Sequence, residues 1–271
     1  EIAHVDLIEQ DLLDQPRDIV KVHMYLAPDE NPAEILPLFK ERLEASGVEY
    51  KLETSGIEQE DWQNAWKKYY HAMDIGQRLA IVPGWETYDT DRIVITMDPG
   101  MAFGTGTHET TRLCLELLEK YVTPGIDFLD MGCGSGILGI AAIKLGAGHV
   151  NAVDIDQNSA RIAAENYKVN GIDSTQYNVY AGDILKDTAL AETVGERPYD
   201  LIAANIVADV IIWMAPSFKK FLAKDGTLIV SGIIAERSGE VIAALERNGF
   251  AVKEFTESED WAVVTLCHAS L

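Results

Sequence analysis

One segment constrains the fold of this chain most: the apolar run, glycine-rich turn and helical pattern of FLDMGCGSGILG, residues 128–139. Gly132, Gly134 and Gly136 allow a sharp turn and leave room for a ligand against the backbone, because glycine has no Cβ. Asp154 follows Gly132 by 22 residues and lies at the end of the next predicted strand. A carboxylate in that place can accept hydrogen bonds from both hydroxyls of a ribose. The spacing therefore predicts a nucleotide-type site at the ends of two adjacent strands.

From about residue 103 onwards, strand and helix patterns alternate along the chain. Strands are expected at 126–131, 149–155, 176–184, 199–206 and 226–234. Helices are expected at 108–121, 136–147, 157–171, 207–223 and 237–249. This alternation predicts an α/β fold with a doubly wound, mostly parallel seven-stranded sheet. Residues 250–268 have the pattern of two strands joined by a polar turn, which adds an antiparallel edge strand to that sheet.

Three regions are expected along the sequence. Residues 1–56 predict a small α+β domain, with two strands around a helix that has a proline near its start and a glycine beyond its end. Residues 57–90 predict a helical and extended linker, whose aromatic side chains pack between elements and which ends in the first of two short strands, at 78–89 and 92–98. Residues 91–271 predict the larger domain, which contains the glycine turn.

Two kinds of cofactor fit the glycine turn. From Gly134 the sequence is G-S-G-I-L-G, which matches the G-x-G-x-x-G pattern of dinucleotide-binding proteins. Asp130 extends the pattern to D-x-G-x-G-x-G, which resembles motif I of class I methyltransferases, and the antiparallel strand also resembles that fold. S-adenosylmethionine further suits the site because it has a free amine and no pyrophosphate. We therefore expect S-adenosylmethionine, with Asp183 either accepting from the adenine amino group or only capping a turn.

Asn205 lies in the predicted strand 199–206, at the sheet edge where open α/β folds place their chemistry. Its amide oxygen, together with adjacent backbone carbonyls, can accept hydrogen bonds from a substrate amine. These bonds would point the lone pair of the amine nitrogen at the methyl group. Positive charge reaches that nitrogen during transfer, so oxygens already in place stabilise it. The following Ile-Val-Ala lacks the prolines and the aromatic residue of enzymes that act on flat nitrogen substrates. Alternatively, Asn205 only caps the next helix.

A second group of glycines occurs in DPGMAFGTGTHETT, residues 98–111. This segment lacks the lysine after the glycines and the preceding strand of a Walker-type phosphate loop. We interpret residues 103–107 as a flexible flap, whose glycines allow movement and whose Phe and Thr side chains close over the cofactor. A rigid turn between domains is the alternative. The next residue, His108, is expected to cap the following helix.

The charge of the chain limits its partners. A net charge of -22 disfavours direct binding of nucleic acid and allows a basic protein partner. The sequence has no apolar run of about 18 residues, the length typical of a membrane span, and no visible signal peptide. Its three cysteines and six histidines show no metal-ligand spacing. We therefore expect no metal, no membrane contact and a cytoplasmic location.

Four segments, in this order, resemble the ribosomal protein L11 methyltransferase family: DPGMAFGTGTHETT, FLDMGCGSGILGIAA, AVDID and AANI. EDWQNAWKKYY and IVPGWE, which lie upstream, resemble that family's bridge between its two domains. The resemblance covers residues 55–271, and AFGTGTH is its most specific mark. The first fifty residues resemble the family's small N-terminal domain only in outline. Because that domain normally begins with a further strand and helix, we expect its start to be missing from this chain.

The resemblance implies an activity and a set of site residues. The family transfers methyl groups from S-adenosylmethionine to several lysine amines and to the N-terminal amine of large-subunit ribosomal protein L11, whose free form the small domain binds. We expect the same reaction here, carried out by a monomer with Asn205 as the catalytic residue. The resemblance implies cofactor contacts at Thr111, Gly132, Asp154 and Asn205, with Phe103, Gly104, Thr105 and Thr107 in the covering loop. The motifs themselves add Asp130, Gly134 and Asp183.

Three alternative functions stay open at this stage. A nicotinamide-dependent oxidoreductase would explain G-S-G-I-L-G equally well. A methyltransferase of the same fold could act on another protein or on a small amine. A binding module could retain the cofactor fold without catalysis, although the presence of Asn205 and of the glycine loop argues against it.

Overall fold

The computed structural model describes residues 70–97, 104 and 106–269. The chain divides into two compact units, Glu1–Gln59 and Glu60–Leu271, and every described residue belongs to the second. The predicted small domain and the predicted linker up to residue 69 lie outside the described residues. The division into three regions therefore stays a prediction.

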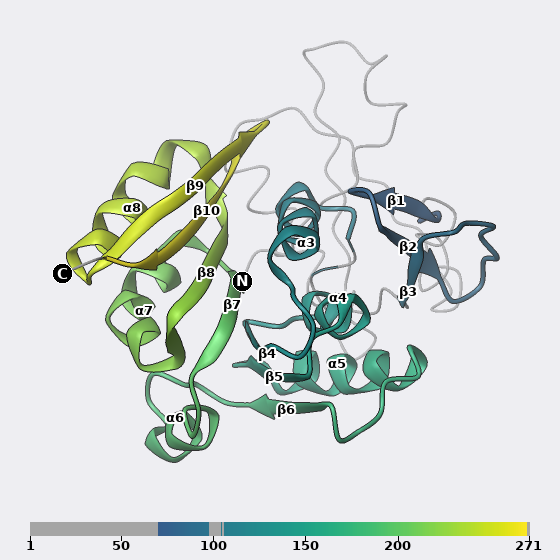
Figure 1. The fold of residues 1–271 in the computed structure, drawn as a ribbon, viewed down its shortest axis with the longest axis horizontal. Coiled ribbons are helices and arrows are strands. Elements are labelled where there is room, and N and C mark those ends of the chain that lie inside the picture. The colour runs from purple at the N-terminus through teal and green to yellow at the C-terminus, as the bar shows by residue number, and fades with distance from the viewer. Residues whose placement is uncertain (1–69, 98–103, 105, 270–271) are drawn as a thin grey trace, which may run out of the picture. The chain divides into compact units, whose positions relative to one another are not determined.

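A seven-stranded sheet forms the centre of the described unit (Figure 1). Its strands are β4 (Asp127–Met131), β5 (His149–Asp154), β6 (Tyr177–Ala181), β7 (Tyr199–Asn205), β8 (Leu222–Ile234), β9 (Phe250–Ser258) and β10 (Trp261–His268). They lie in the order β6-β5-β4-β7-β8-β10-β9, and the first five run parallel. β10 pairs antiparallel with both β8 and β9, so it lies one place inside the sheet and β9 forms the edge. The predicted doubly wound, mostly parallel fold with an antiparallel strand is confirmed.

Helices cover both faces of this sheet (Figure 1). They are α3 (Glu109–Tyr121), α4 (Ile137–Leu145), α5 (Gln157–Val169), α6 (Thr188–Val194), α7 (Ala208–Phe221) and α8 (Ser238–Arg247). The first three pack in one apolar cluster and the last three in another, on opposite sides of the strands. In the part of the chain that the structure describes, no helix is long and apolar enough to cross a membrane.

The central strands are apolar on both sides, because each side faces a layer of helices. Phe128 and Leu201 pack with α3 and α4, whereas Leu129 and Ile202, their neighbours in sequence, pack with α7 and α8. Successive side chains of a strand point to opposite faces, so a strand covered on both faces is a continuous apolar run. This explains why these strands were predictable from short apolar runs.

The predicted elements of the larger domain match the observed ones within a few residues, and one α-helix was missed. The missed element is α6, which has seven residues and Val194 as its buried residue. Its N-cap is Asp187, whose Oδ1 accepts from the backbone nitrogen of Leu190 at 3.0 Å. So short a helix with so little buried surface leaves no recognisable period in the sequence.

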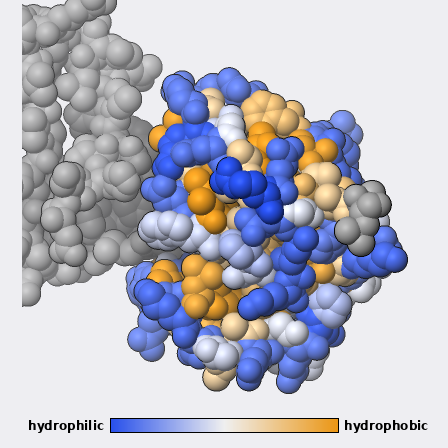
Figure 2. Space-filling view, turned by 90° about the vertical axis from the view of Figure 1, so that its left-hand side faces the viewer, coloured by the Kyte–Doolittle hydropathy of each residue, from blue (hydrophilic) through white to orange (hydrophobic). Residues whose placement is uncertain are grey.

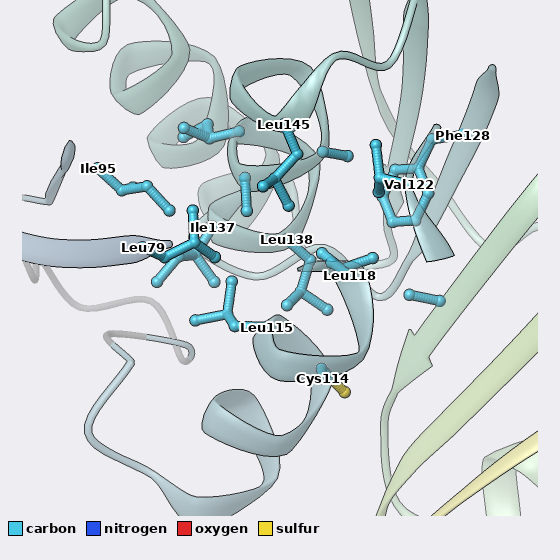
Figure 3. Close-up of a cluster of buried hydrophobic side chains, with 14 of the residues drawn as sticks. Leu79, Ile95, Cys114, Leu115, Leu118, Val122, Phe128, Ile137, Leu138 and Leu145 are labelled. Atoms are coloured by element: carbon cyan, nitrogen blue, oxygen red, sulfur yellow. The ribbon is translucent and has the colours of Figure 1, made fainter. Parts of the chain in front are cut away.

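A second, smaller sheet precedes α3 and shares its core. It contains β1 (Met73–Ile75), β2 (Leu79–Pro83) and β3 (Ile93–Met97). β1 pairs antiparallel with β2, and β2 pairs parallel with β3, which confirms the two short strands predicted here. Leu79 and Ile95 meet Leu115 of α3 and Ile137 of α4 in one buried cluster (Figure 3). The predicted linker ends at residue 90, so its described part is a packed sheet rather than a free connection.

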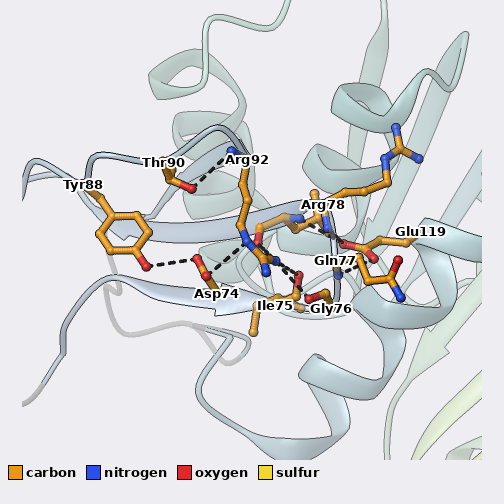
Figure 4. A network of polar contacts seen from close by, with 10 residues as sticks. Asp74, Ile75, Gly76, Gln77, Arg78, Tyr88, Thr90, Arg92 and Glu119 are labelled. Carbon is orange, nitrogen blue, oxygen red and sulfur yellow. Dashed lines mark hydrogen bonds and ion pairs between the residues drawn. The ribbon is translucent and has the colours of Figure 1, made fainter.

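Glu119 of α3 fastens the turn between β1 and β2 to the core (Figure 4). Its carboxylate accepts hydrogen bonds from the backbone nitrogens of Gln77, Arg78 and Leu79 at 2.8, 2.7 and 3.0 Å. Hydrogen bonds to a charged acceptor are stronger than those between neutral groups. One side chain thus satisfies three amides of a tight turn and ties that turn to a helix about forty residues later in the chain.

Arg92 donates hydrogen bonds to the carbonyl groups of the same turn, whose amides bond to Glu119 (Figure 4). Its Nη1 donates to the carbonyl oxygens of Ile75, Gly76 and Leu79 at 3.1, 3.0 and 3.2 Å. Its Nε lies 3.1 Å from Oδ2 of Asp74. The small sheet is therefore held by polar contacts at its turn as well as by its buried face.

Two helical glycines provide a matched test of this packing. A Cβ built on Gly139 of α4 would clash with Oη of the fully buried Tyr167, whereas one built on Gly239 of α8 would meet nothing within 4 Å. Alanine is favoured over glycine in helices by up to about 1 kcal/mol where it fits. We expect Gly239→Ala to raise the free energy of unfolding by about 0.5 kcal/mol and Gly139→Ala to lower it by about 1–3 kcal/mol. Urea denaturation measures both.

Tyr167 supplies the control for that prediction. Its hydroxyl is buried and has no hydrogen-bond partner among the described residues, so Tyr167→Phe removes the obstructing atom without breaking a described bond. We expect Tyr167→Phe to restore part of the stability lost in Gly139→Ala. If the double variant is as unstable as the two single changes combined, contact with the hydroxyl is not the cause.

Candidate functional site

A cavity lies where the carboxyl ends of β4 and β7 meet the beginnings of α3 and α4. Its lining residues are Gly104, Thr111, Gly132, Cys133, Gly134, Ile137, Leu138 and Asn205. The enclosed volume is about 20 Å³, enough for a water molecule, so a nucleoside-sized ligand would extend beyond it across the strand ends. This is the edge of the sheet at which open α/β folds bind their ligands.

Several of the predicted site residues come together in this cavity. They lie in the loop before α3, in α3 itself, in the glycine turn and at the end of β7: Gly104, Thr111, Gly132, Gly134 and Asn205. Thr107 is exposed just before α3, and Phe103 and Thr105 lie outside the described residues. None of the three predicted aspartates lines the cavity. Asp154 and Asp130 bond to the glycine turn and to α4, whereas Asp183 follows β6 and makes only local contacts.

Three lining residues were not predicted: Cys133, Ile137 and Leu138. Cys133 lies between the predicted glycines, and the other two begin α4 directly after the turn. Their apolar side chains carry no chemical signal of their own. Only their position beside the glycines could have indicated them.

Gly132 allows the chain to turn at the end of β4. Its φ of 74° lies in the left-handed region, which residues with a Cβ rarely adopt. A Cβ built there would clash with Cγ2 of Ile206, the residue after Asn205. The backbone nitrogens of Gly132 and Cys133 donate to the carbonyl oxygen of Val153 at 2.8 and 3.1 Å. A larger residue at 132 would therefore disturb both the turn and the end of β7.

Asp154 holds the glycine turn from the side. Its Oδ2 accepts from the backbone nitrogen of Gly134 at 2.8 Å, and its Oδ1 accepts from that of Asp156 at 2.9 Å. Each carboxylate oxygen has a further lone pair, so these contacts leave acceptor capacity for a ligand. Its predicted role toward a ribose stays a prediction, and its contacts show a second role, in fixing the turn.

Asp130 lies beneath the turn and is almost fully buried. Its Oδ2 accepts from the backbone nitrogen of Gly139, in the first turn of α4, at 3.1 Å. The N-cap of that helix is Gly136, which has no side chain to accept such a bond. Burial raises the pKa of Asp130 to about 7, with a smaller contribution from the charge of Asp154, and the bond from Gly139 opposes this rise. Asp130 therefore acts as a cap from inside the core.

Asp183 follows β6 and forms a local turn. Its Oδ1 accepts from the backbone nitrogen of Leu185 at 3.0 Å, and its Oδ2 lies 2.9 Å from Nζ of Lys186. The hydrogen bond from Lys186 is the main reason that the pKa of Asp183 is below its ordinary value. These are the contacts of the turn-capping alternative. An additional contact with adenine stays a prediction.

Asn205 presents an unsatisfied oxygen at the cavity. Its Nδ2 donates to Oγ1 of Thr111 at 3.3 Å, and this bond assigns the orientation of the amide. Its Oδ1 is buried and has no hydrogen-bond partner among the described residues. An unpaired buried acceptor costs about 1–3 kcal/mol, so a donor from a ligand would relieve that cost. The alternative role as a helix cap is wrong, because Val207 is the N-cap of α7 and no side chain caps it.

The prediction that His108 caps a helix is confirmed. His108 is the N-cap of α3, and its Nδ1 accepts from the backbone nitrogen of Thr110 at 3.3 Å. Its ring also meets that of Trp261 edge to face, with centroids 4.7 Å apart. Within residues 70–97, 104 and 106–269, no three His, Cys, Asp or Glu side chains form a possible metal site.

The lining of the cavity suits the binding of a ligand that donates hydrogen bonds, rather than nucleophilic attack by a side chain of the protein. The cavity is lined by glycine backbone, aliphatic side chains, the Thr111 hydroxyl and the Asn205 amide. Its thiol, that of Cys133, is buried, and burial raises its pKa well above the ordinary value, so it remains a neutral thiol. A ligand with N–H groups would meet the oxygen of Asn205 there.

Comparison with known proteins agrees with the sequence motifs. The family model described as ribosomal protein L11 methyltransferase matches residues 2–268. A ribosomal protein L11 methyltransferase of Acetivibrio thermocellus is 40% identical over 275 residues, which cover 98% of this chain and 85% of that protein. The one of Pelotomaculum thermopropionicum is 43% identical over 261 residues, which cover 89% and 82%. A crystal structure of a ribosomal protein L11 methylase from Lactobacillus delbrueckii subsp. bulgaricus has a TM-score of 0.65 and 35% identity, covering 74% of this chain and 100% of that chain.

The raised pKa of Asp130 predicts how the stability of the fold depends on pH. At pH 5 its carboxyl is protonated in the folded chain, where its pKa is about 7, but mostly ionised in the unfolded chain, where its pKa is about 4. The folded state therefore binds more protons between about pH 4 and pH 7, and this group makes the fold less stable as the pH rises through that window. Asp130→Asn removes the effect, so we expect its melting temperature relative to wild type to be higher at pH 8 than at pH 5.

A surface carboxyl serves as the control for this measurement. Asp225, in β8, is exposed, and the relative melting temperature of Asp225→Asn is expected to change little between the two pH values. If Asp130→Asn behaves like Asp225→Asn, the carboxyl of Asp130 is not protonated in the folded chain.

Proposed function

The chain belongs to the ribosomal protein L11 methyltransferase family, and we propose that it transfers methyl groups from S-adenosylmethionine to lysine side-chain amines and to the N-terminal amine of large-subunit ribosomal protein L11. The family supports S-adenosylmethionine as the methyl donor and L11 as the acceptor. In the site itself, one observation carries the proposal: the buried, unpaired Oδ1 of Asn205 on a cavity beside the glycine turn.

The residues around the cavity fit S-adenosylmethionine. The turn at Gly132 and Gly134 leaves its backbone open on the cavity side, Asp154 has spare acceptor capacity for ribose hydroxyls, and Asn205 offers an oxygen to an N–H group. Thr111 would contact the cofactor from the start of α3. The cofactor supplies an activated methyl group on a positively charged sulfur. The chain supplies the surface that orients this group toward the substrate.

Asn205 would act directly on the amine that receives the methyl group. Its Oδ1 accepts an N–H of the amine and holds the nitrogen lone pair in line with the methyl group. Positive charge develops on that nitrogen during transfer, and an oxygen already fixed in place stabilises the charge. The bond from Nδ2 of Asn205 to Thr111 keeps the carboxamide from rotating. Thr111 is thus a positioning residue for the catalytic oxygen.

The amine must lose a proton before it can accept a methyl group. A lysine side chain has an ordinary pKa of about 10.4, and both a water-poor site and a nearby positive sulfur favour its neutral form. The described lining of the cavity contains no charged side chain that would hold the amine in its protonated form. The site therefore favours deprotonation without a dedicated base in contact with the amine.

The charge of the chain suits a basic protein substrate. The net charge is -22, which attracts cationic partners and repels nucleic acid. On the face of the described unit seen in Figure 2, hydrophobic residues form separate patches among hydrophilic ones. This face therefore offers a partner mainly hydrophilic residues. The proposal includes action on free L11, by a monomer, in the cytoplasm, where ribosomal proteins are made.

Parts of the proposal concern residues outside the described ranges. Residues 1–56 would bind the protein substrate, and residues 57–90 would include the connection to the catalytic domain. Gly104 lines the cavity, which supports a loop at 103–107 that covers the cofactor, with Phe103, Thr105 and Thr107 as further contacts. The oxidoreductase alternative is set aside because the whole chain matches a methyltransferase family.

The role of Asn205 can be tested by separating turnover from cofactor affinity. We expect Asn205→Ala to lower kcat for L11 methylation by about 100-fold or more, as the loss of one fixed transition-state contact does in other enzymes. The dissociation constant of S-adenosylhomocysteine should change only a few-fold. We expect Thr111→Val to lower kcat less, because it frees the carboxamide without removing it. Unchanged turnover of Asn205→Ala would disprove the catalytic role.

The substrate can be tested with a mixture of purified ribosomal proteins. We expect mass spectrometry, after incubation with the enzyme and isotopically labelled S-adenosylmethionine, to find labelled methyl groups on lysine and N-terminal amines of L11. Asn205→Ala provides the matched negative sample. Label on another protein would refute L11 as the acceptor, and cofactor binding without any label would indicate a binding module.

A further inference from the structure

The segment between β3 and α3 is tied to α5 at its beginning by the side chain of Asn170. The backbone nitrogen of Thr96 donates to Oδ1 of Asn170 at 2.9 Å, and Nδ2 of Asn170 donates to the carbonyl oxygen of Thr96 at 2.7 Å. Thr96 lies in β3, and Asn170 is the C-cap of α5. A side-chain amide thus bonds to β3 in both directions, as a neighbouring strand would.

One helical turn earlier, α5 is bonded to the glycine turn. Nδ2 of Asn166 donates to the carbonyl oxygen of Ser135 at 2.9 Å, and Asn166 is buried, with 3% of its surface exposed. The Nδ2 of Asn170 also donates to the carbonyl oxygen of Asn166 at 2.9 Å. Two asparagines on one face of α5 therefore connect β3 with the glycine turn.

Gly104, which precedes α3, is bonded to the glycine turn at Ser135. Oγ of Ser135 donates to the carbonyl oxygen of Gly104 at 2.5 Å, and Ser135 is 2% exposed. Gly104 lines the cavity together with Gly132 and Asn205. A continuous series of hydrogen bonds thus leads from Thr96, through Asn170, Asn166 and Ser135, to Gly104. We call it the asparagine–serine chain.

We propose that Ser135, Asn166 and Asn170 are positioning residues of the cofactor site, which hold Gly104 in place against the cavity. None of the three lines the cavity, so their effect on a ligand must pass through the residues that they hold. The asparagine–serine chain fixes Thr96 to α5 and Gly104 to the glycine turn. Gly104 therefore loses less conformational entropy when a ligand binds. The inference rests on the proposed function, because it takes S-adenosylmethionine as the ligand.

The structure offers a matched control for each end of the asparagine–serine chain. Asn248 is the C-cap of α8, and its Nδ2 donates to the carbonyl oxygen of Ala244, four residues earlier, at 2.8 Å. Asn170 makes the same local bond in α5, so only its bonds to Thr96 distinguish the two positions. For Ser135, the control is Ser238, whose Oγ donates to the carbonyl oxygen of Ala235 at 2.7 Å.

The experiment measures the dissociation constant of S-adenosylhomocysteine by calorimetry on the full chain and its variants. Ser135→Ala and Asn170→Ala are each expected to weaken binding by about three- to tenfold, the effect of losing one or two neutral hydrogen bonds. Asn248→Ala and Ser238→Ala should leave it unchanged. Asn170→Ala frees Thr96 and Ser135→Ala frees Gly104, but both changes interrupt the same asparagine–serine chain. The loss of affinity in the double variant should therefore be smaller than the product of the two single losses.

Kinetics add a result that a merely structural role would not produce. We expect Ser135→Ala and Asn170→Ala to raise KM for S-adenosylmethionine while kcat at saturating cofactor stays near that of wild type. Urea denaturation should show a larger loss of stability in Asn170→Ala than in Asn248→Ala, because Asn170→Ala also loses the two bonds to Thr96. A fall in kcat without a change in KM would overturn the inference.

The outcomes separate this inference from the proposed function. If the wild-type chain binds S-adenosylhomocysteine but Ser135→Ala and Asn170→Ala bind it equally well, the asparagine–serine chain does not position the site. Independent effects that multiply in the double variant would also overturn the proposed chain. If Asn170→Ala does not fold, the comparison of Ser135→Ala with Ser238→Ala decides alone. If the wild-type chain binds no S-adenosylhomocysteine, the proposed function fails, and this inference fails with it.

Discussion

The structure of the site depends on how two carboxylates hold the backbone of one glycine turn. Asp154 accepts from the amide of Gly134 beside the turn, and Asp130 accepts from the amide of Gly139 beneath it. The turn needs left-handed backbone at Gly132, and the N-cap of α4, Gly136, has no side chain that could accept from the first amides of the helix. The two aspartates satisfy amides that would otherwise be unpaired. The beginning of α4 and the floor of the cavity follow from these two bonds.

Much of this fold could be predicted from sequence because its elements are locally distinct. The central strands are short apolar runs covered on both faces, and the helices between them have one apolar face, so both patterns are visible in a single sequence. The position of β10 between β8 and β9 was not predictable in that way. A polar turn between two strands reveals that they form a hairpin, but not which of them pairs with the rest of the sheet.

The candidate site was predictable in its parts but not in its contacts. Asn205 and the glycine turn were found because each lies at the carboxyl end of a predicted strand, where parallel strands present their ligands. The capping role of Asp130 was hidden, since the motif shows an aspartate near glycines but not whether it faces a ligand or the core. The bond between Asn205 and Thr111 and the pairing of Asn170 with Thr96 join residues 94 and 74 positions apart. Such contacts follow from tertiary packing, and no local pattern encodes them.

The position of β10 between β8 and β9 determines the order in which the sheet can form during synthesis. β10 follows every other strand of the seven-stranded sheet along the chain, yet it supplies the pairing partner on which both β8 and β9 depend. A chain that emerges from the ribosome one end first can therefore pair β4 to β8 early, but it exposes an open edge of β8 until its last strand is free. β9 pairs with β10 and with no other strand of this sheet, so β9 can join the sheet only together with β10. The sheet of this ribosomal-protein methyltransferase is therefore complete only after β10 has been synthesised.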